Sequence, residues 1–421
     1  MKYLIVLGDG MADEPIEALN GLTPMQAAHT PVMDFLAREG RCGGLETVPE
    51  GFAPGSEIAN MSLLGYDVRT QFEGRGSLEA ASMGVDIPDG WMAARCNLIC
   101  VENDCIKNHS AGHISNEEAA QLIDYLNEHL ADDGLRFCAG ISYRHLMLMK
   151  GGDKRIQCTP PHDVPGTPCA QVMVKALHPD AQATADKINH LIQRSQELLP
   201  LHPLNQARKA AGKDMASSIW PWSPGYRPAM PTLTSQYPIK SGAVISAVDL
   251  IKGIGVYAGL ESIEVEGATG LYDTNYEGKA QAAIQALKEK DFVFLHVEAS
   301  DEASHEGDVD LKIKTIEYLD HRLIEPIFKE VSAWDEAVSI AVLPDHPTYC
   351  RLKTHVAQAV PFLIWRNDAA RARIKASMPD KVQSFDELAV MTGSYGILKG
   401  QAFMQKLFNS ERSGERNAER E

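Results

Sequence analysis

Short apolar runs that end in acidic residues or histidine recur along this chain. Three of them have the length and composition of buried strands: Tyr3–Leu7, Phe292–Leu295 and the run that begins at Val338. Other segments carry apolar residues at helical spacing, as in Asn116–Leu130 and Thr184–Leu199. Buried strands alternating with amphipathic helices predict an α/β fold, with a mostly parallel sheet flanked by helices.

The residues that follow these runs are of the types that bind metal ions. Asp301 and His305 are four residues apart, so one turn of helix would place both on one face. The ends of parallel strands lie along one edge of a sheet, where ligands bind in α/β proteins. Six nitrogen and oxygen ligands at such an edge are enough for two metals. The six candidates are Asp9, Asp301, His305, Asp345, His346 and His355. For the Asp301 stretch alone, the alternative is a solvated acidic loop with a capping Asp.

Ser56 is a further candidate because it follows a glycine and opens a predicted helix. Gly55 permits a tight turn, and the backbone N–H groups of a first helical turn have no partner within the helix. The N–H groups and the positive end of the helix dipole can bind a phosphate there. The alternative is that Ser56 is an ordinary N-cap.

At 421 residues the chain is long enough for two domains. We expect residues 1–64 and 231–409 to form the core and residues 65–230 to form an inserted smaller α/β domain. Proline-rich stretches, Leu199–Pro203 and Trp220–Gly225, are interpreted as boundaries. The charged tail, residues 410–421, is expected to be disordered.

Composition limits the partners and the location. The formal net charge is −17, which disfavours binding to nucleic acid or an anionic membrane. No run of about 18 apolar residues occurs, so we expect a soluble, cytoplasmic protein without a membrane partner. The eight cysteines include no CxxC pair and are interpreted as reduced thiols. The oligomeric state is not predicted.

Seven motifs distributed from the N-terminus to about residue 408 carry a family resemblance: GDGMAD, PGSEIANMSLLGYD, GSLEAASMG, SAGHIS, AVDLIKGIG, HVEASDEASHEGD and PDH. Together they resemble the cofactor-independent (2,3-bisphosphoglycerate-independent) phosphoglycerate mutases, the archaeal-type branch of the alkaline phosphatase superfamily. The resemblance implies an alkaline-phosphatase-like core and two divalent metal ions, for which the ligand types favour manganese, zinc or magnesium.

The resemblance also implies residue roles. One metal would be held by Asp301, His305 and His355, and the other by Asp9, Asp345 and His346 with Ser56 beside it as nucleophile and ligand. His113 matches the family's acid/base or phosphate-contacting histidine, with a structural loop histidine as the alternative. The inserted domain would hold the organic part of the substrate and exclude water. Candidate substrate-binding residues, any of which could instead form a surface salt bridge, are Arg75, Arg95, Arg144, Arg227 and Lys240.

The activity that the resemblance implies is interconversion of 3-phosphoglycerate and 2-phosphoglycerate, in glycolysis and gluconeogenesis, through a phosphoserine. The segment around SAGHIS has histidines, His109 and His113, where the family pattern has more arginine, and Ile219–Tyr226 is rich in tryptophan. A related branch acts on homoserine, so a homoserine kinase-like phosphotransferase of threonine biosynthesis is the alternative. A phosphatase and a catalytically inactive metal-binding protein are further alternatives, the latter disfavoured by the complete set of Ser56 and six ligands.

Overall fold

The computed structural model describes residues 1–374 and 378–409, and the chain divides into two compact units. The first unit contains Met1–Phe72 and the chain from Met230 onward, and the second is Glu73–Ala229. The first boundary thus lies after Phe72 and not at residue 64, because the segment that follows α3 packs on the first unit. Tyr66 is buried there, and its hydroxyl donates to the carbonyl oxygen of Pro231 at 2.9 Å. The predicted tail, residues 410–421, lies outside the described residues.

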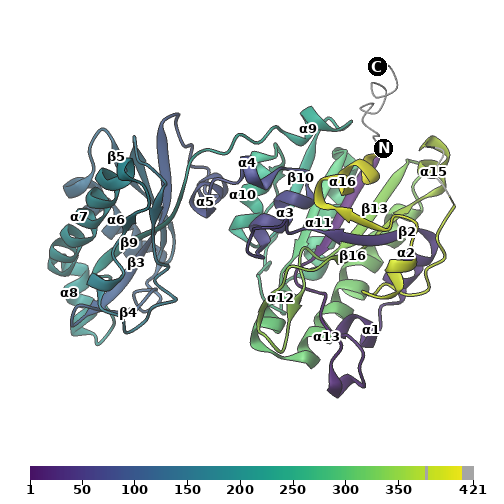
Figure 1. The fold of residues 1–421 in the computed structure, drawn as a ribbon, viewed down its shortest axis with the longest axis horizontal. Coiled ribbons are helices and arrows are strands. Elements are labelled where there is room, and N and C mark those ends of the chain that lie inside the picture. Colours follow the sequence, from purple (N-terminus) through teal and green to yellow (C-terminus); the bar gives the residue numbers. More distant parts are fainter. Residues whose placement is uncertain (375–377, 410–421) are drawn as a thin grey trace. The chain divides into compact units, whose positions relative to one another are not determined.

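The first unit is built on a mostly parallel sheet, as predicted (Figure 1). The strand order is β11-β10-β12-β1-β13-β16-β2-β17, and only β16 is antiparallel to its neighbours on both sides. The strands are β1 (Lys2–Gly8), β2 (Arg41–Glu46), β10 (Gly242–Ile245), β11 (Glu261–Ser262), β12 (Phe292–Val297), β13 (Val338–Leu343), β16 (Val360–Arg366) and β17 (Ile397–Lys399). A separate pair is β14 (Thr348–Tyr349) and β15 (Thr354–His355).

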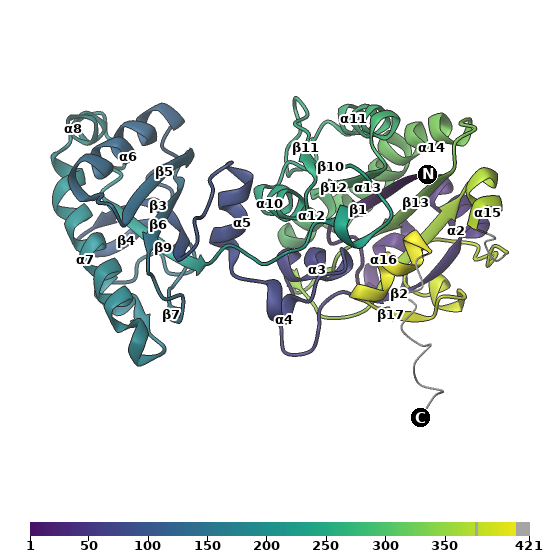
Figure 2. The same cartoon turned by 90° about the horizontal axis from the view of Figure 1, so that it is seen from above.

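Helices cover both faces of this sheet (Figure 2). Helices α2, α11 and α14 pack on one side, and α3, α10 and α16 pack on the other. The central strands β1, β12 and β13 are buried along their whole length, as expected of a sheet covered on both faces. The helices are α1 (Pro24–Ala27), α2 (Pro31–Glu39), α3 (Ser56–Leu63), α4 (Val68–Gln71), α9 (Leu233–Gln236), α10 (Asp249–Tyr257), α11 (Tyr276–Glu289), α12 (Ala299–Glu306), α13 (Val309–Tyr318), α14 (Glu325–Ser332), α15 (Asp368–Ile374) and α16 (Gly400–Phe408).

Local sequence explains where several helices begin or change form. Thr23 caps α1 by accepting from the backbone N–H of Gln26, and Gln26 reciprocates in a capping box. A π-helical segment, Leu319–Ile324, separates α13 from α14. Pro326 is the second residue of α14. A proline inside a helix lacks the N–H needed by the preceding turn, which accounts for the irregularity at this point.

The strand order places the ends of four neighbouring strands side by side. Strands β12, β1, β13 and β16 are consecutive in the sheet. Because β16 is antiparallel to β13, its amino end lies at the same edge as the carboxyl ends of the other three. Residues that follow β1, β12 and β13 and residues that precede β16 therefore meet at this edge, which we call the carboxyl edge.

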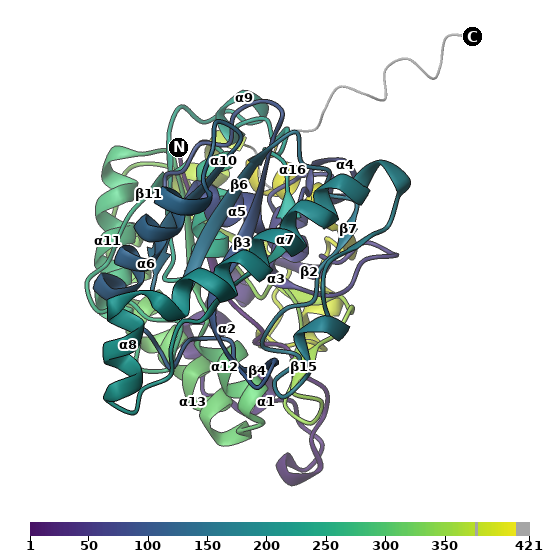
Figure 3. The same cartoon turned by 90° about the vertical axis from the view of Figure 1, so that its left-hand side faces the viewer.

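The second unit is an antiparallel sheet with helices packed on it (Figure 3). Its strands are β3 (Trp91–Glu102), β4 (Cys105–Asn108), β5 (Leu135–Ile141), β6 (Arg144–Lys150) and β9 (Ser218–Gly225), with a small pair β7 (Ile156–Gln157) and β8 (Lys175–Ala176). Its helices are α5 (Arg75–Ser82), α6 (Asn116–Leu130), α7 (Gln182–Leu198) and α8 (Pro203–Ala210). In Figure 3, which views this unit, α6 and α7 lie in front of the sheet.

The interpretation of Trp220–Gly225 as a proline-rich boundary is wrong. This segment belongs to strand β9, which pairs with β3 and buries Trp220 and Trp222 in the core of the second unit. Proline is tolerated in a strand at the edge of a sheet, where its missing N–H breaks no ladder on the open side. Among the helices that the structure describes, none is long and apolar enough to cross a membrane.

A buried ion pair fixes the loop after β1, and its loss should destabilise the first unit. Lys312 and Asp13 are fully buried with their charged groups 2.9 Å apart, and the Lys312 ammonium also donates to the carbonyl oxygens of Ala12 and Thr348. Replacing Lys312 by Met would leave the Asp13 carboxylate buried without its partner. We expect Lys312→Met to lower the free energy of unfolding by about 3–5 kcal/mol, measured by chemical denaturation.

The control is Lys314→Met, on the exposed side of the same helix. This change should alter the free energy of unfolding by less than about 0.5 kcal/mol. Equal stability of the two variants would show that the buried pair does not hold the loop.

Candidate active site

Three of the predicted ligands converge at the carboxyl edge after β1 and β13. Asp9, Asp345 and His346 are fully buried and offer ligand atoms that all lie within 4.8 Å of one another. The His346 Nε2 atom is 3.7 Å from Asp9 Oδ1 and 3.3 Å from Asp345 Oδ2. Two carboxylates and one imidazole at these distances can hold a divalent cation.

The other predicted ligands form a neighbouring group around Asp301. Asp301 and His305 lie on one face of α12, with His305 Nε2 at 3.1 Å from Asp301 Oδ2. His355, on β15, approaches the other oxygen of Asp301 at 3.5 Å, and its Nε2 is 3.0 Å from that of His305. The rings of His355 and His346 are stacked at 3.9 Å between centroids, so the two groups adjoin.

Ser56 lies at the first group and does not act as a helix cap. Helix α3 begins at Ser56, its N-cap residue is Gly55, and no side chain caps it. The Ser56 Oγ atom instead lies 3.1 Å from Nε2 of His346. The N-cap interpretation is therefore wrong. The serine hydroxyl points at the candidate ligands, and α3 has no side-chain cap among the residues that the structure describes.

Asn60 connects Ser56 to this group from one turn further along α3. Its side-chain amide donates to Asp345 Oδ2 at 2.9 Å and to the carbonyl oxygen of Ser56 at 2.9 Å. The backbone N–H of Gly10 donates to the other oxygen of Asp345 at 3.3 Å. These hydrogen bonds orient the Asp345 carboxylate relative to the start of α3.

The charges of the carboxyl edge are balanced only in part by protein groups. Burial, together with the charges of Asp345 and Glu298, raises the pKa of Asp9 well above its usual range. Burial also opposes ionisation of Asp301, but its hydrogen bonds with His305 and His355 outweigh burial and lower its pKa. Oxygen Oδ1 of Asp9 is buried and has no hydrogen-bond partner in the part of the chain that the structure describes. Crowded carboxylates with a free oxygen fit a site that binds cations.

Two residues at this edge are functional candidates that the sequence reasoning did not identify. His296 is fully buried within β12 and places Nε2 at 2.9 Å from Asp9 Oδ2. Glu298 follows directly after β12, and burial with the charges of Asp301 and Asp345 raises its pKa to about 8. A signal for His296 was available, since a polar residue inside an otherwise apolar buried strand is unusual.

The candidate substrate-binding residues are not all brought together. Arg227 is exposed and forms a surface ion pair with Asp86 at 3.0 Å. Lys240 is exposed and precedes β10, so it lies at the amino end of that parallel strand, whereas the candidate ligands lie at the carboxyl edge. Strand direction within the sheet follows from the tertiary fold, so the local sequence around Lys240 does not tell the two ends of the strand apart.

The other three arginines form one cluster in the second unit. Arg95 projects from β3, stacks over the ring of Trp222 at 4.1 Å and pairs with Glu79 at 3.0 Å. Burial, together with the charges of Arg75 and Arg144, lowers the pKa of Arg95 to about 10, although Glu79 opposes this. The Nε atom of Arg75 is buried and has no hydrogen-bond partner among the described residues. Such a cluster of cations can bind anionic groups of a ligand.

His113 lies in a strained loop of the same unit. Ala111, Gly112 and His113 all have positive φ angles, which is uncommon for residues other than glycine. The loop is fixed by buried Arg208, which donates to the carbonyl oxygen of Ala111 at 2.7 Å, and by Asn108, which accepts from the N–H of Gly112 at 3.1 Å. Strain maintained in this way is characteristic of functional loops.

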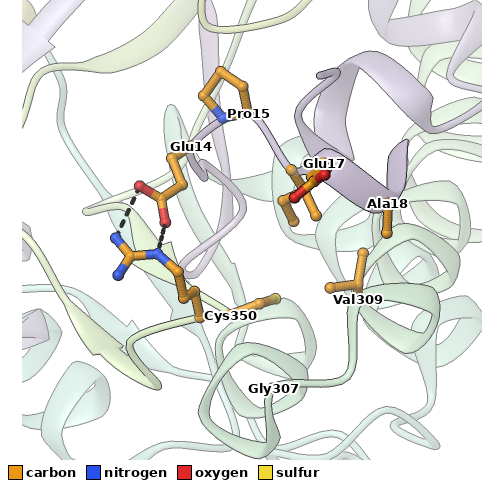
Figure 4. Close-up of a pocket in the computed structure, with 9 residues that line it drawn as sticks. Glu14, Pro15, Glu17, Ala18, Gly307, Val309 and Cys350 are labelled. Atoms are coloured by element: carbon orange, nitrogen blue, oxygen red, sulfur yellow. Dashed lines mark hydrogen bonds and ion pairs between the residues drawn. The ribbon is translucent and has the colours of Figure 1, made fainter. Parts of the chain in front are cut away.

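A separate hollow of about 720 Å³ in the first unit opens beside the loop after β1 (Figure 4). The ion pair of Glu14 and Arg351, at 2.6 Å, lies on its wall. Its described lining contains none of the predicted ligands and consists of Glu14, Pro15, Ile16, Glu17, Ala18, Gly307, Val309, Cys350 and Arg351. We therefore do not assign the chemistry to this hollow.

The fold and the site define an α/β protein in which a serine hydroxyl lies beside carboxylates and imidazoles that could hold a metal ion. Comparison with known proteins identifies the family. The family model for 2,3-bisphosphoglycerate-independent phosphoglycerate mutase matches residues 37–205.

Relatives match over almost the whole chain. A 2,3-bisphosphoglycerate-independent phosphoglycerate mutase of Methanosarcina acetivorans is 51% identical over 95% of this chain and 97% of its own length. A probable enzyme of the same name from Geobacter sulfurreducens is 44% identical over 88% of this chain and 92% of its own length. The chain belongs to the family of 2,3-bisphosphoglycerate-independent phosphoglycerate mutases, which confirms the resemblance.

Solved structures agree with this assignment. A protein of Pyrococcus horikoshii is 31% identical, with a TM-score of 0.79 over 98% of this chain and 99% of that one. The cofactor-independent phosphoglycerate mutase of Thermoplasma acidophilum is 26% identical, with a TM-score of 0.68 over 97% of this chain and 99% of that one.

The pairing of Asp301 with His305 predicts a pH-dependent interaction in the metal-free protein. The hydrogen bond that the His305 imidazole donates to the Asp301 carboxylate raises the pKa of His305 to about 9, although partial burial opposes this. A histidine with a raised pKa contributes stability that is fully present below its unfolded pKa of about 6.5 and is lost as the pH rises through the folded value. The Asp301→Asn variant should therefore be less stable than the wild type at pH 6, with the difference vanishing above about pH 9.

The measurement is an NMR titration of the imidazole of His305 in chelator-treated protein, with the resonance assigned through His305→Gln. In Asp301→Asn the pKa of His305 should fall by more than one unit. The internal control is His145 in the second unit, whose pKa burial lowers to about 4 and which should titrate alike in both proteins. An unchanged His305 pKa in the variant contradicts the pairing.

Proposed function

We propose that this chain interconverts 3-phosphoglycerate and 2-phosphoglycerate through a phosphoserine at Ser56, with two divalent metal ions at the carboxyl edge. The observation that carries the proposal is the position of the Ser56 hydroxyl. Its Oγ atom lies 3.1 Å from Nε2 of His346, within the group that includes Asp9 and Asp345, and it makes no capping hydrogen bond. Membership of the mutase family supports the substrate.

The ligand set fits the two ions. Asp9, Asp345 and His346 would hold one ion with Ser56 beside it, and Asp301, His305 and His355 would hold the other. Burial lowers the pKa of His346, which keeps its imidazole neutral, as a metal ligand must be. When bound, divalent cations lower the pKa of an adjacent hydroxyl and neutralise phosphoryl oxygens. The mixture of oxygen and nitrogen ligands favours manganese, zinc or magnesium.

In the proposed reaction, Ser56 Oγ gives its proton to solvent and bonds to phosphorus as the bond from phosphorus to the substrate oxygen breaks. We assign to His113 the delivery of a proton to that oxygen. The other hydroxyl of the glycerate then gives its proton back to His113 and attacks phosphorus, the bond from phosphorus to Oγ breaks, and Oγ takes a proton from solvent, which frees Ser56. Free N–H groups at the start of α3 are suited to the phosphoryl oxygens.

Binding of the substrate is assigned to the arginine cluster of the second unit. Arg75, Arg95 and Arg144 offer planar forks that match a carboxylate or phosphate in two hydrogen bonds each. Burial is the main cause of the lowered pKa of Arg95 and the charges of Arg75 and Arg144 add to it, so a bound anion would stabilise this group of cations. Arg227 and Lys240 are exposed and are left out of the proposed binding set.

Ser56→Ala tests the proposal. The variant should fold, because Ser56 does not cap its helix and even the loss of a cap costs only about 1 kcal/mol. It should keep its Asp and His ligands, yet mutase activity should fall by at least about three orders of magnitude, because the covalent acceptor is gone. Brief incubation of the wild type with ³²P-labelled 3-phosphoglycerate should label the peptide that contains Gly55-Ser56-Glu57.

The matched control is Ser62→Ala, at the far end of the same helix, where the hydroxyl lies beside Gly400. This variant should keep its activity and its label. Phosphate release and homoserine phosphorylation are assayed in parallel with mutase activity on the same proteins. Label at another residue, or substantial turnover by folded Ser56→Ala, contradicts the phosphoserine mechanism, and faster homoserine phosphorylation than isomerisation contradicts the substrate.

Arg75→Met tests the assignment of the arginine cluster. Removing one charge-assisted contact of about 1.5–3 kcal/mol should raise KM for 3-phosphoglycerate by about ten- to a hundredfold. The control is Arg227→Met, which breaks only an exposed ion pair and should leave KM within about twofold. Steady-state kinetics of both variants distinguish the roles. An unchanged KM in Arg75→Met removes this residue from the binding set.

A further inference from the structure

Two features of the second unit that the proposed reaction does not use lie beside the arginine cluster. One is the tryptophan-rich strand β9, and the other is a pair of histidines, His109 and His162. The guanidinium of Arg95 lies over the indole ring of Trp222, from β9, at 4.1 Å from the ring centroid. The imidazole of His162 packs on the same indole in a T-shaped contact, with 5.3 Å between ring centroids. One indole ring therefore contacts both the arginine cluster and a histidine.

Buried hydrogen bonds hold this part of the second unit in place. Asn97 is buried and accepts from Nε1 of Trp222 at 3.0 Å, which fixes the indole ring. The other tryptophan of β9, Trp220, donates through its own Nε1 to the carbonyl oxygen of Thr159 at 2.9 Å. Thr159 begins the loop that carries His162. Strand β9 thus positions both the indole ring and the loop whose imidazole packs on it.

His162, and not His109, is the imidazole on which the arginines act. The two rings lie 5.9 Å apart between centroids. Burial lowers the pKa of both imidazoles. The charge of Asp163 opposes this effect at His162, whereas the charges of Arg95 and Arg75 add to it. The charges that add to it at His109 are those of two other histidines. His162 is therefore a neutral ring next to fixed cations.

A neutral imidazole in this place suits a different part of the substrate from the arginines. Nε2 of His162 lies 3.5 Å from Oδ1 of Asp163, which favours the ring proton on Nε2 and leaves Nδ1 as the nitrogen that can accept a hydrogen bond. Arginine has donors only and matches carboxylates and phosphates. A hydroxyl can instead donate to an imidazole nitrogen. The His162 side chain is 46% exposed, so a ligand can reach it.

We propose that His162 is a specificity-determining residue of the mutase reaction, whose Nδ1 accepts a hydrogen bond from the free hydroxyl of the phosphoglycerate. This inference rests on the proposed function. His162 holds that hydroxyl while the other oxygen carries the phosphoryl group, and the proton transfers remain with His113. A site that binds a substrate hydroxyl in this way discriminates against analogues that lack it. The indole of Trp222 then keeps the group that binds an anion and the group that binds the hydroxyl next to each other.

The compound 3-phosphonooxypropanoate tests this role, because it has the carboxylate and phosphate of 3-phosphoglycerate but no hydroxyl. It is used as an inhibitor of full-length protein assayed with Mn²⁺. His162→Phe keeps an aromatic ring against Trp222 and removes the acceptor. We expect KM for 3-phosphoglycerate to rise about three- to tenfold in this variant, with the inhibition constant of the analogue within about twofold of the wild-type value. His162→Asn, whose side chain has an acceptor oxygen, should recover part of the loss.

The matched control is His190→Phe, at an exposed position of α7 in the same unit, which should leave both constants unchanged. Circular dichroism confirms folding, and His162→Leu, which also lacks an acceptor, replaces His162→Phe if that variant does not fold. A merely structural role of His162 changes both constants together. That result, or an unchanged KM, overturns the proposal while the wild type still isomerises 3-phosphoglycerate. A wild type without this isomerisation rejects the proposed function and the inference with it.

Discussion

Repulsion among buried carboxylates is the constraint on which this structure depends. Asp9, Asp301, Asp345 and Glu298 gather at one edge of a sheet whose strands are otherwise apolar. Taking a carboxylate out of water costs several kcal/mol unless a positive partner is present. Protein groups supply only part of that charge, chiefly His305 and Lys279. The core is consequently shaped to accept divalent cations, and a fold that buries these acids is most stable with cations bound.

The topology of the sheet explains how residues far apart in sequence meet at this edge. Most candidate ligands follow one of the three parallel strands β12, β1 and β13, whereas His355 precedes the antiparallel strand β16. His355 still reaches the same edge because β16 runs in the opposite direction. The short pair of β14 and β15 then folds His355 back towards Asp301. A parallel β16 would place the segment before it at the opposite edge, away from the other ligands.

Much of the site could be predicted from the sequence because a buried strand followed by acids or histidine is a local pattern. Asp9, Asp301 and Asp345 could be predicted as ligands in this way, and the strands themselves could be predicted from short apolar runs. The direction and pairing of strands are not determined by local sequence, because they depend on contacts between residues far apart in the chain. Lys240 was therefore predicted to bind substrate although it precedes β10 and lies at the amino end of that strand. The segment Trp220–Gly225, part of the paired strand β9, was interpreted as a boundary because its prolines obscured the period. His296 was passed over because it lies inside a strand and not after it.

Ser56 shows why local pattern alone does not determine function. A serine after glycine at the start of a helix is compatible with a cap and with a nucleophile, since both uses need the same residue at nearly the same position. The two uses differ in whether the serine occupies the N-cap position or the next position, which is the first residue of the helix. Gly55 takes the N-cap position in an extended conformation, so Ser56 becomes the first residue of α3 and its hydroxyl is released from the backbone. The hydroxyl instead contacts His346, which follows β13 and lies 290 positions further along the chain, and only the tertiary fold creates that contact.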